Sequence, residues 1–340
     1  MRKWMRRVVV VVLVAVVLLL AWVGYIYYLS KTRQPNLDRT VVHASLSAPV
    51  ALVRDDFGVP HITAKTEADA WFALGYAMGQ DRLFQMELLR RLACGELAEI
   101  LGRPALPVDR IVRGFGLRAG AERFVKENGP KHPEVMAIAE AFCAGINHAM
   151  TTEPCPFEFT ALGIPFRPFT PTDGLAVAAI LPISFADGIR EDPMASMIKA
   201  RRPDIDIDTI FPAYDKEVPI TIMESLEEAI AFARERDAAS GRADRNVRPT
   251  LDDGATISVA GAKALEELLK PLAMISHHFG PQLGSNSWVV SGKRTVSGKP
   301  ILANDPHISF TNPGVWYEAH IVAGDFELYG HFLPLIPVAL

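Results

Sequence analysis

The sequence predicts an α+β protein that follows an N-terminal transmembrane helix, and three observations support this fold class. An uncharged apolar run extends from residue 8 to about residue 29 behind a basic start. Short apolar runs between turn residues, which are typical of strands, occur around residues 50–63 and again after residue 284. Helical spacing of apolar residues is found mainly between these two regions. Strands that are separated in this way from helices along the chain agree with an α+β arrangement.

Length and composition narrow the class of protein. The chain has 340 residues, of which 49% are hydrophobic, enough for one large core or for two domains. The formal charge of −4 offers no basic surface for nucleic acid, so no nucleic-acid partner is expected. Cys94, Cys143 and Cys155 are too few for a disulfide framework and are not spaced for zinc. We expect small buried side chains here, with at most one disulfide.

Residues 1–30 predict a membrane segment. Four basic residues lie among the first seven, and aromatic residues gather at the far end of the apolar run 8–29. A run of this length is able to cross the hydrocarbon core as a helix, with its basic end in the cytoplasm. No small-residue cleavage site follows the run, so we favour an uncleaved signal anchor over a removed signal peptide. Either way, the rest of the chain is exported to the periplasmic or extracellular face of the cytoplasmic membrane.

A polar tether and a pair of strands are expected after this segment. Residues 31–49 are polar and irregular, as in a linker that leads away from a membrane. The apolar runs 50–53 and 59–63 enclose a polar turn that contains glycine. This pattern predicts a strand–turn–strand.

A long helix should begin directly after the second strand. Thr66 with Asp69 three residues later is a capping box, and apolar residues then recur at helical spacing. Two small residues within it, Gly75 and Gly79, would let another element approach closely. Gly95 would end the helix or mark a point of tight packing.

Two more helices are expected in the middle of the chain. One covers about residues 133–150, and a loop rich in proline and phenylalanine follows over residues 153–169. The next helix has a second capping box, in which Thr170 caps, Pro171 takes the first helical position and Asp173 the third.

This last helix contains Pro182, which removes a backbone hydrogen bond and predicts a kink. Ser184 and Phe185 at the expected bend suit the wall of a substrate pocket. A simple core helix explains the same apolar pattern equally well.

A change in composition separates this region from the C-terminal strands. Residues 235–284 begin with the longest weakly apolar interval of the exported part and are read as a linker. Two strand pairs should follow, with arms over residues 288–290, 301–303, 315–322 and 326–332.

The sequence excludes several standard catalytic sites. It has no G-x-S-x-G elbow, no phosphate-binding G-x-x-x-x-G-K-[ST] loop and no H-E-x-x-H zinc motif. One serine, Ser285, follows Gly284 directly ahead of an apolar run. Cleavage of the bond between them would make Ser285 a new N-terminus. Its α-amine, with a reference pKa of about 7.7–8.0, could then act as the base for its own hydroxyl.

Two segments carry a resemblance to a known family. GSNSWVVSGKRTVSGKPILANDPH, which begins at Gly284, resembles the start of the β-subunit in the penicillin acylase family of N-terminal-nucleophile hydrolases. VRDDFGVPHITAKTEADAWFALGYAMGQDRLFQMELLRRLACGELAEILG, which begins at Val53, resembles the opening of that family's α-subunit. The resemblance extends from residue 50 to residue 340.

The resemblance assigns roles to individual residues. Ser285 is implied as the nucleophile and, through its amine, as the general base, and Gly284 as the last residue removed at autoprocessing. His307 falls where family members carry His or Gln and is implied to hold the amine or hydroxyl in position. Pro182, Ser184 and Phe185 align with a helix of the acyl pocket. Glu191, or Asp192 beside it, lies near a calcium-ligating glutamate, so a structural calcium ion but no organic cofactor is expected.

The same resemblance implies the architecture, an αββα sandwich of the N-terminal-nucleophile type that is incomplete here. The implied regions are a signal anchor (1–30), a tether (31–49), an α-subunit-like part (50–234), a spacer peptide (235–284) and the start of a β-subunit (285–340). The α and β chains of one precursor would be partners. Because the family's oxyanion-hole residues would follow residue 340, we expect this chain to be a fragment that is inactive alone.

The predicted function is therefore hydrolysis of a linear amide through an acyl-enzyme on Ser285, with a small N-acyl amide as substrate. Penicillin-type amides, acyl-homoserine lactones and other N-acyl amines remain open as substrate classes. A second hypothesis is a non-catalytic, membrane-tethered binding module of the same fold. Self-cleavage before Ser285 distinguishes the two.

Overall fold

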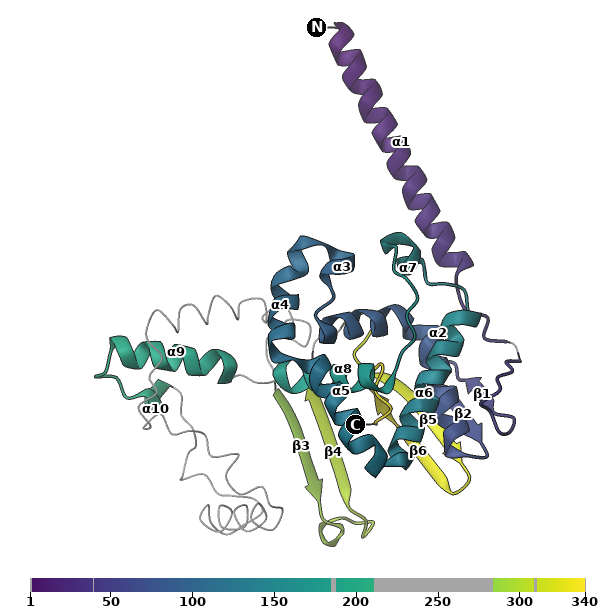
Figure 1. The fold of residues 1–340 in the computed structure, drawn as a ribbon, viewed down its shortest axis with the longest axis vertical. Coiled ribbons are helices and arrows are strands. Elements are labelled where there is room, and N and C mark those ends of the chain that lie inside the picture. The colour runs from purple at the N-terminus through teal and green to yellow at the C-terminus, as the bar shows by residue number, and fades with distance from the viewer. Residues whose placement is uncertain (1, 39, 185–187, 211–283, 309–310, 340) are drawn as a thin grey trace. The chain divides into compact units, whose positions relative to one another are not determined.

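The structure is a computed structural model, and it describes residues 2–38, 40–184, 188–210, 284–308 and 311–339. Contacts divide the chain into two compact units, Met1–Phe185 with Met274–Leu340, and Ala186–Ala273. In the described part of the second unit are helix α9 (Gly188–Arg201) and the short α10 (Ile207–Ile210). Figure 1 shows the described elements of both units.

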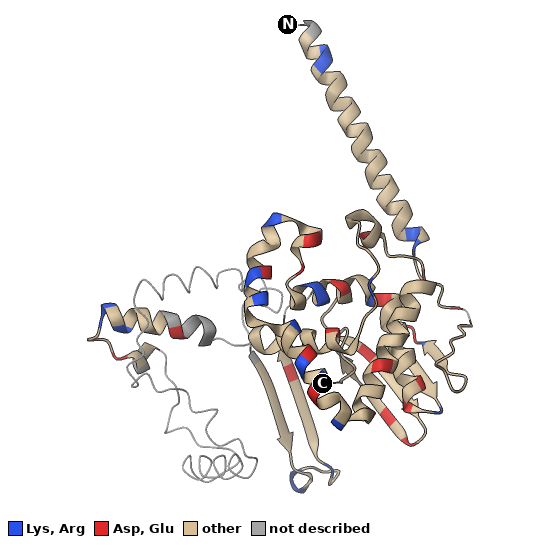
Figure 2. Ribbon diagram, viewed as in Figure 1, with Lys and Arg blue, Asp and Glu red and all other residues tan. Residues whose placement is uncertain are grey.

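Helix α1 (Arg2–Thr32) contains the predicted membrane segment. Its apolar side chains are exposed along nearly the whole length, and Figure 2 shows no charged residue between its basic ends. Within the described residues it is the one helix that is long and apolar enough to cross a membrane. A signal sequence has the same properties, so the helix agrees with both alternatives drawn from the sequence.

A four-stranded sheet combines strands from residues 51–64 with strands from residues 317–332. Its strands are β1 (Ala51–Arg54), β2 (Pro60–Ala64), β5 (Tyr317–Ala323) and β6 (Phe326–Phe332), in the order β1-β2-β5-β6. The pairs β1–β2 and β5–β6 are the antiparallel pairs predicted from the sequence. The sequence did not predict that β2 pairs in parallel with β5. The segments resembling an α-subunit and a β-subunit therefore share one sheet.

Strand alternation gives this sheet one buried and one polar face. Ile62 of β2 and Ile321 of β5 point to the buried face and belong to the same core cluster as Trp71 and Leu74 of helix α2. Residues at the intervening positions, including His61 and His320, face the other way and are partly exposed.

Helix α2 (Glu67–Cys94) begins and ends where the sequence predicts. The Thr66 hydroxyl accepts a hydrogen bond from the Asp69 backbone N–H, which caps the first turn. The Asp69 carboxylate instead accepts bonds from the backbone N–H and hydroxyl of Ser47, at 2.9 and 2.6 Å. It thereby fixes the tether to the helix. At the other end Gly95 adopts a left-handed conformation, with φ of 65°.

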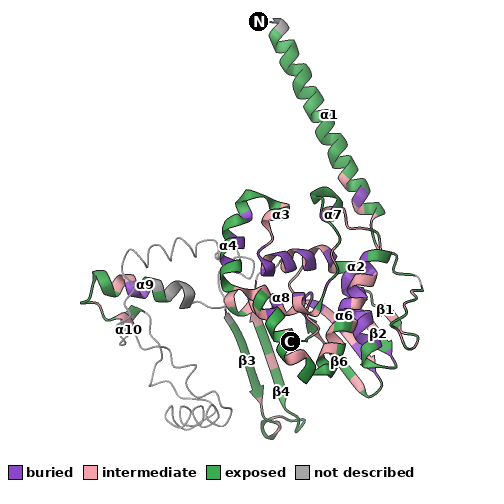
Figure 3. Ribbon diagram, in the orientation of Figure 1, coloured by how far each residue is buried: buried purple, intermediate pink, exposed green. Residues whose placement is uncertain are grey.

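Helix α6 (Pro133–Thr152) packs closely against α2, as the glycines in α2 predict. A β-carbon on Gly75 would lie 2.0 Å from the carbonyl oxygen of Phe142, and one on Gly145 of α6 would lie 1.9 Å from that of Phe72. Both positions thus need glycine, because any side chain would push the two helices apart. Figure 3 shows how strongly α2 is buried.

The remaining helices of the first unit are partly unexpected. The sequence predicts α8 (Pro171–Ser184), and Asp173 accepts bonds from the backbone N–H and hydroxyl of Thr170, both at 2.8 Å. It does not predict the helices between residues 96 and 132 or α7 within the expected loop 153–169. These are α3 (Ala98–Leu101), α4 (Leu106–Phe115), α5 (Leu117–Asn128) and α7 (Phe157–Leu162). All three cysteines are free, and Cys155 is only partly buried.

Candidate active site

A two-stranded hairpin carries the predicted nucleophile. Strand β3 (Gly284–Val290) pairs antiparallel with β4 (Ile301–His307) along its whole length, so both arms are longer than the predicted ones. The turn is held by Ser291, whose hydroxyl accepts from the Lys293 backbone N–H, and by Thr295, whose hydroxyl donates to the Lys299 carbonyl at 2.7 Å. These local bonds set the register that positions the opposite end of the hairpin.

That opposite end brings together the three residues of the predicted catalytic and processing site. Ser285 lies opposite Pro306, and Gly284 lies opposite His307. His307 is therefore one register position from Ser285 and directly across from the residue before the predicted cleavage point. Ser285 is exposed, as the cleaved bond and the substrate would both require.

The register also determines which face each side chain occupies. Directly opposed residues share a face and successive residues alternate, so Ser285 shares a face with Pro306 while His307 is on the other face. The Nε2 atom of His307 lies 2.9 Å from an oxygen of Asp305, two residues earlier on the same face. In this conformation Asp305, not the Ser285 hydroxyl, is the partner of His307.

Apolar side chains along the hairpin are exposed. Trp288 on one face of the ribbon is 54% exposed, and Val289 and Leu302 on the other are 67% and 70% exposed. Figure 3 shows both strands almost wholly in the colour for exposed residues. The hairpin, which contains the strand of the predicted nucleophile, thus has exposed apolar side chains on both of its faces.

The structure places the other predicted site residues less completely. Pro182 is inside α8, close to its C-terminal end, and is exposed. Ser184 is the last residue of α8, but its side chain lies outside the described part, as does all of Phe185. The predicted pocket wall near Ser285 therefore stays a prediction.

The predicted calcium ligand is in the second unit. Glu191 belongs to α9 and its side chain is not described, whereas the neighbouring Asp192 is exposed. Among the described residues, no group of three or more His, Cys, Asp and Glu side chains could hold a metal ion. Because the side chain of Glu191 is not described, its assignment as a calcium ligand stays a prediction.

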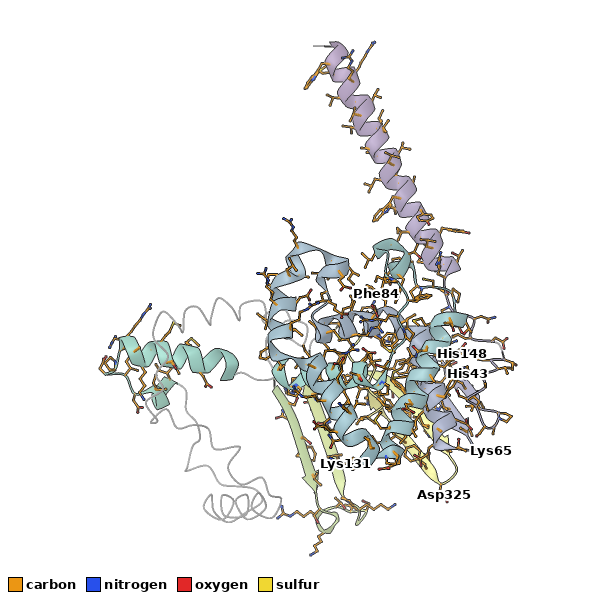
Figure 4. All side chains as sticks on the ribbon, in the orientation of Figure 1. His43, Lys65, Phe84, Lys131, His148 and Asp325 are labelled. Carbon is orange, nitrogen blue, oxygen red and sulfur yellow. The ribbon has the colours of Figure 1, made fainter. Side chains whose placement is uncertain are left out.

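Sequence reasoning did not anticipate a cleft of about 660 Å³ between the tether and helix α2. Its lining comes from the segment between Asn36 and Val53 together with aromatic residues of α2, and it includes His43. Figure 4 labels His43 beside His148 of α6, and their rings are 4.6 Å apart. Neither Ser285 nor His307 lines this cleft. No periodic pattern in the tether could have signalled it.

Comparison with known proteins gives a consistent set of relatives. Residues 49–340 match the family model for penicillin amidase. The chain is 31% identical over 315 residues to a penicillin acylase 2 proenzyme from Pseudomonas sp. strain SE83, covering 89% of this chain and 36% of that protein. It is 29% identical over 298 residues to the acyl-homoserine lactone acylase QuiP of Pseudomonas aeruginosa, covering 86% of this chain and 31% of the relative.

A solved structure of a thermostable penicillin G acylase from Alcaligenes faecalis matches with 24% identity and a TM-score of 0.43. That match covers 52% of this chain and 97% of the solved chain. The chain spans about a third of the length of the curated relatives it matches.

Proposed function

The chain belongs to the penicillin amidase family, and from this premise we propose that it is part of an amidohydrolase whose nucleophile is Ser285. The proposed substrate is a small molecule with a linear N-acyl amide bond. The proposed architecture of the mature protein is the αββα sandwich of N-terminal-nucleophile hydrolases. The mixed helix and sheet content of the first unit agrees with it.

Maturation is the first step of the proposed mechanism. The Ser285 hydroxyl attacks the carbonyl carbon of Gly284, the C–N bond breaks, and the resulting ester is hydrolysed by water. The products are a chain that ends at Gly284 and a chain that begins with the free amine of Ser285. Gly284 leaves its carbonyl sterically open because it has no side chain.

The free amine then serves as the general base in hydrolysis. It accepts the proton of the Ser285 hydroxyl, through a bridging water, as the oxygen attacks the substrate carbonyl. The amine returns that proton to the leaving amine as the C–N bond breaks, which leaves an acyl-enzyme ester. Water then hydrolyses the ester and releases the acid. An α-amine has a reference pKa of about 7.7–8.0, so a substantial neutral fraction exists near pH 8 without special tuning.

One observation carries the proposal: Ser285 is exposed at the start of a strand and is paired with the strand that ends in His307. A cut before Ser285 would leave the new N-terminus anchored by the pairing of β3 with β4. Preorganisation of this kind is what a nucleophile and its base require.

The class of acyl group is the less defined part of the proposal. The relatives include a penicillin acylase and acyl-homoserine lactone acylases, so both kinds of N-acyl amide are candidate substrates. We place the protein on the outer face of the cytoplasmic membrane, anchored by residues 8–29 of α1. A non-catalytic tethered module of the same fold is the alternative.

Mass spectrometry of the full-length gene product tests the proposal. The wild type should yield a chain that begins at Ser285, and Ser285→Ala should remain uncut. A set of amides with different acyl chains, assayed for released amine, then defines the substrate. An uncut wild type that still hydrolyses these amides would overturn the mechanism, and an uncut inactive wild type would favour the binding module.

A further inference from the structure

The polar face of the four-stranded sheet holds a pair of histidines that the proposed reaction does not use. His61 of β2 lies directly opposite His320 of β5 in the parallel register, so both side chains are on the same face. Their Nδ1 atoms are 3.2 Å apart. The side chain of His61 is 40% exposed and that of His320 is 24% exposed, so solvent and ions reach both rings.

Each ring has a carboxylate at its other nitrogen. The Nε2 atom of His61 lies 3.5 Å from Asp55, and the Nε2 atom of His320 lies 3.1 Å from Glu327. A carboxylate accepts hydrogen bonds, so these two contacts favour the tautomer in which Nε2 carries the proton. In the neutral form of each ring with this tautomer, Nδ1 has a lone pair that is able to bind a cation. The two Nδ1 atoms, 3.2 Å apart, are close enough to bind the same ion.

We propose that His61 and His320 form a two-histidine binding site for a divalent transition-metal ion such as Cu²⁺ or Zn²⁺. Imidazole nitrogen is a preferred ligand of these ions. Zinc–nitrogen bonds of about 2.0–2.1 Å at the tetrahedral angle place two nitrogens about 3.3–3.4 Å apart, close to the observed separation. With bonds of this length the ion lies off the line between the two nitrogens, so each ring would have to turn its Nδ1 lone pair toward it.

The surroundings favour a bound cation. Asp55 and Glu327 would act as outer carboxylates, which orient metal-ligating histidines by accepting their second N–H. Glu318 adds a third carboxylate nearby, as it accepts a hydrogen bond from Tyr329, whose ring lies 5.7 Å from that of His320. The hydrogen bond to Glu318 is the main cause of a raised pKa at Tyr329, with smaller effects of burial and of the Glu318 and Asp55 charges.

The site has two protein ligands, since the described residues contain no group of three or more that could hold a metal. Waters would complete the coordination. Such an ion would connect β2 to β5, and so would join the parts of the chain before and after the proposed cleavage point. Metal binding should therefore raise the thermal stability of the chain.

Copper electron paramagnetic resonance on the detergent-solubilised full chain tests the site with CuCl₂ as the probe. We expect a signal with two coordinated nitrogens in the wild type and its loss in His61→Ala and in His320→Ala. His331→Ala is the matched control, because His331 projects from β6 on the same face and should leave the signal unchanged. Circular dichroism without metal establishes that each variant is folded, and His320→Gln replaces any variant that is not.

Calorimetry with ZnCl₂ gives a second measurement. Glu327→Gln should weaken zinc binding by about 10–100-fold, because Glu327 is exposed and acts only through His320. Equal metal affinity in the wild type and the two histidine variants would overturn the proposal and leave a shared proton between the rings. Both results are independent of cleavage at Ser285 and of amide hydrolysis.

Discussion

Ile62 of β2 and Ile321 of β5 lie in register on adjacent parallel strands, and both are almost completely inaccessible to solvent. The first belongs to the segment before the proposed cleavage point and the second to the segment after it. The hydrophobic core of the first unit is therefore built by both sides of Ser285. Cleavage of one peptide bond removes none of these contacts.

The first prediction follows from that pairing. After cleavage before Ser285, the two chains should remain associated, because the β2–β5 ladder and the core beneath it do not depend on the cut bond. They should elute together in native size-exclusion chromatography and separate on a denaturing gel. Ile321→Ala should lower the free energy of unfolding by about 2–5 kcal/mol.

Val289→Ala is the control, because Val289 is 67% exposed and should cost little. Separation of the two chains under native conditions would contradict the role given to the β2–β5 pairing.

The extent to which the sequence predicted this fold depends on how local each signal is. The starts of α2 and α8 were predicted because Thr66 and Thr170 form their caps with residues three positions away. The β2–β5 pairing was not, because alternation in a strand specifies its buried face and not its partner. The sequence does not predict helix α4 as a separate element, although Val108, Ile111 and Val112 show helical spacing.

The candidate site was predicted in part for the same reason. Ser285 and His307 could be chosen from motif and spacing, and the structure places them at one end of a hairpin. The face on which His307 lies depends on the exact register. The predicted arms do not specify that register, because the strands extend beyond them to Gly284 and His307.

The second prediction concerns the contact between α2 and α6. Gly145→Ala should destabilise the protein by about 1–3 kcal/mol or more, because the new β-carbon would lie 1.9 Å from the carbonyl oxygen of Phe72. Gly120→Ala in α5 is the matched control, since no atom lies within 4 Å of its β-carbon position. That control should be neutral or stabilising by up to about 1 kcal/mol. Urea denaturation measures both, and equal effects would contradict the packing.

The third prediction concerns a buried ion cluster in α2. Glu87 is fully buried and bonds to Arg90 and, at 2.6 Å, to Arg91. Glu87→Gln leaves the buried Arg90 without its carboxylate and Arg91 with Glu99 as its remaining carboxylate, so it should cost about 3–5 kcal/mol in thermal or urea unfolding. Glu122→Gln breaks an exposed pair with Arg118 of the same spacing as Glu87–Arg91 and should cost less than about 1 kcal/mol. A comparable loss of stability in both variants would contradict the predicted difference between the buried and the exposed ion pairs.

The fourth prediction uses the cysteines as reporters of burial. Burial raises the pKa of the Cys143 thiol to about 12, and the nearby Asp173 and Glu140 charges add to the shift. The thiolate is the reactive form, so at pH 8 only about one Cys143 side chain in ten thousand is ionised. Iodoacetamide should therefore label the partly buried Cys155 and spare Cys143 in the native protein. Peptide mass spectrometry reads out both sites, and denaturation in urea should make them equally reactive.

The fifth prediction tests the role of the His307–Asp305 pair in maturation. His307 lies opposite Gly284 and its Nε2 contacts Asp305, so we predict that it positions the bond before Ser285 for cleavage. His307→Ala should slow the appearance of the Ser285 chain by about a hundredfold, the low end of the range for a positioned acid or base. Asp305→Asn keeps an oxygen acceptor for the ring and should have a smaller effect.

Lys293→Ala, at the turn end of the same hairpin, is the control and should mature at the wild-type rate. Far-ultraviolet circular dichroism of the uncut variants separates a slow reaction from a failure to fold. His307→Gln gives the decisive comparison, because an amide side chain is able to donate and accept hydrogen bonds but does not ionise near neutral pH. Rescue by Gln would assign His307 to hydrogen bonding, and failure of the rescue would assign it to proton transfer. Unchanged cleavage in His307→Ala would exclude both roles.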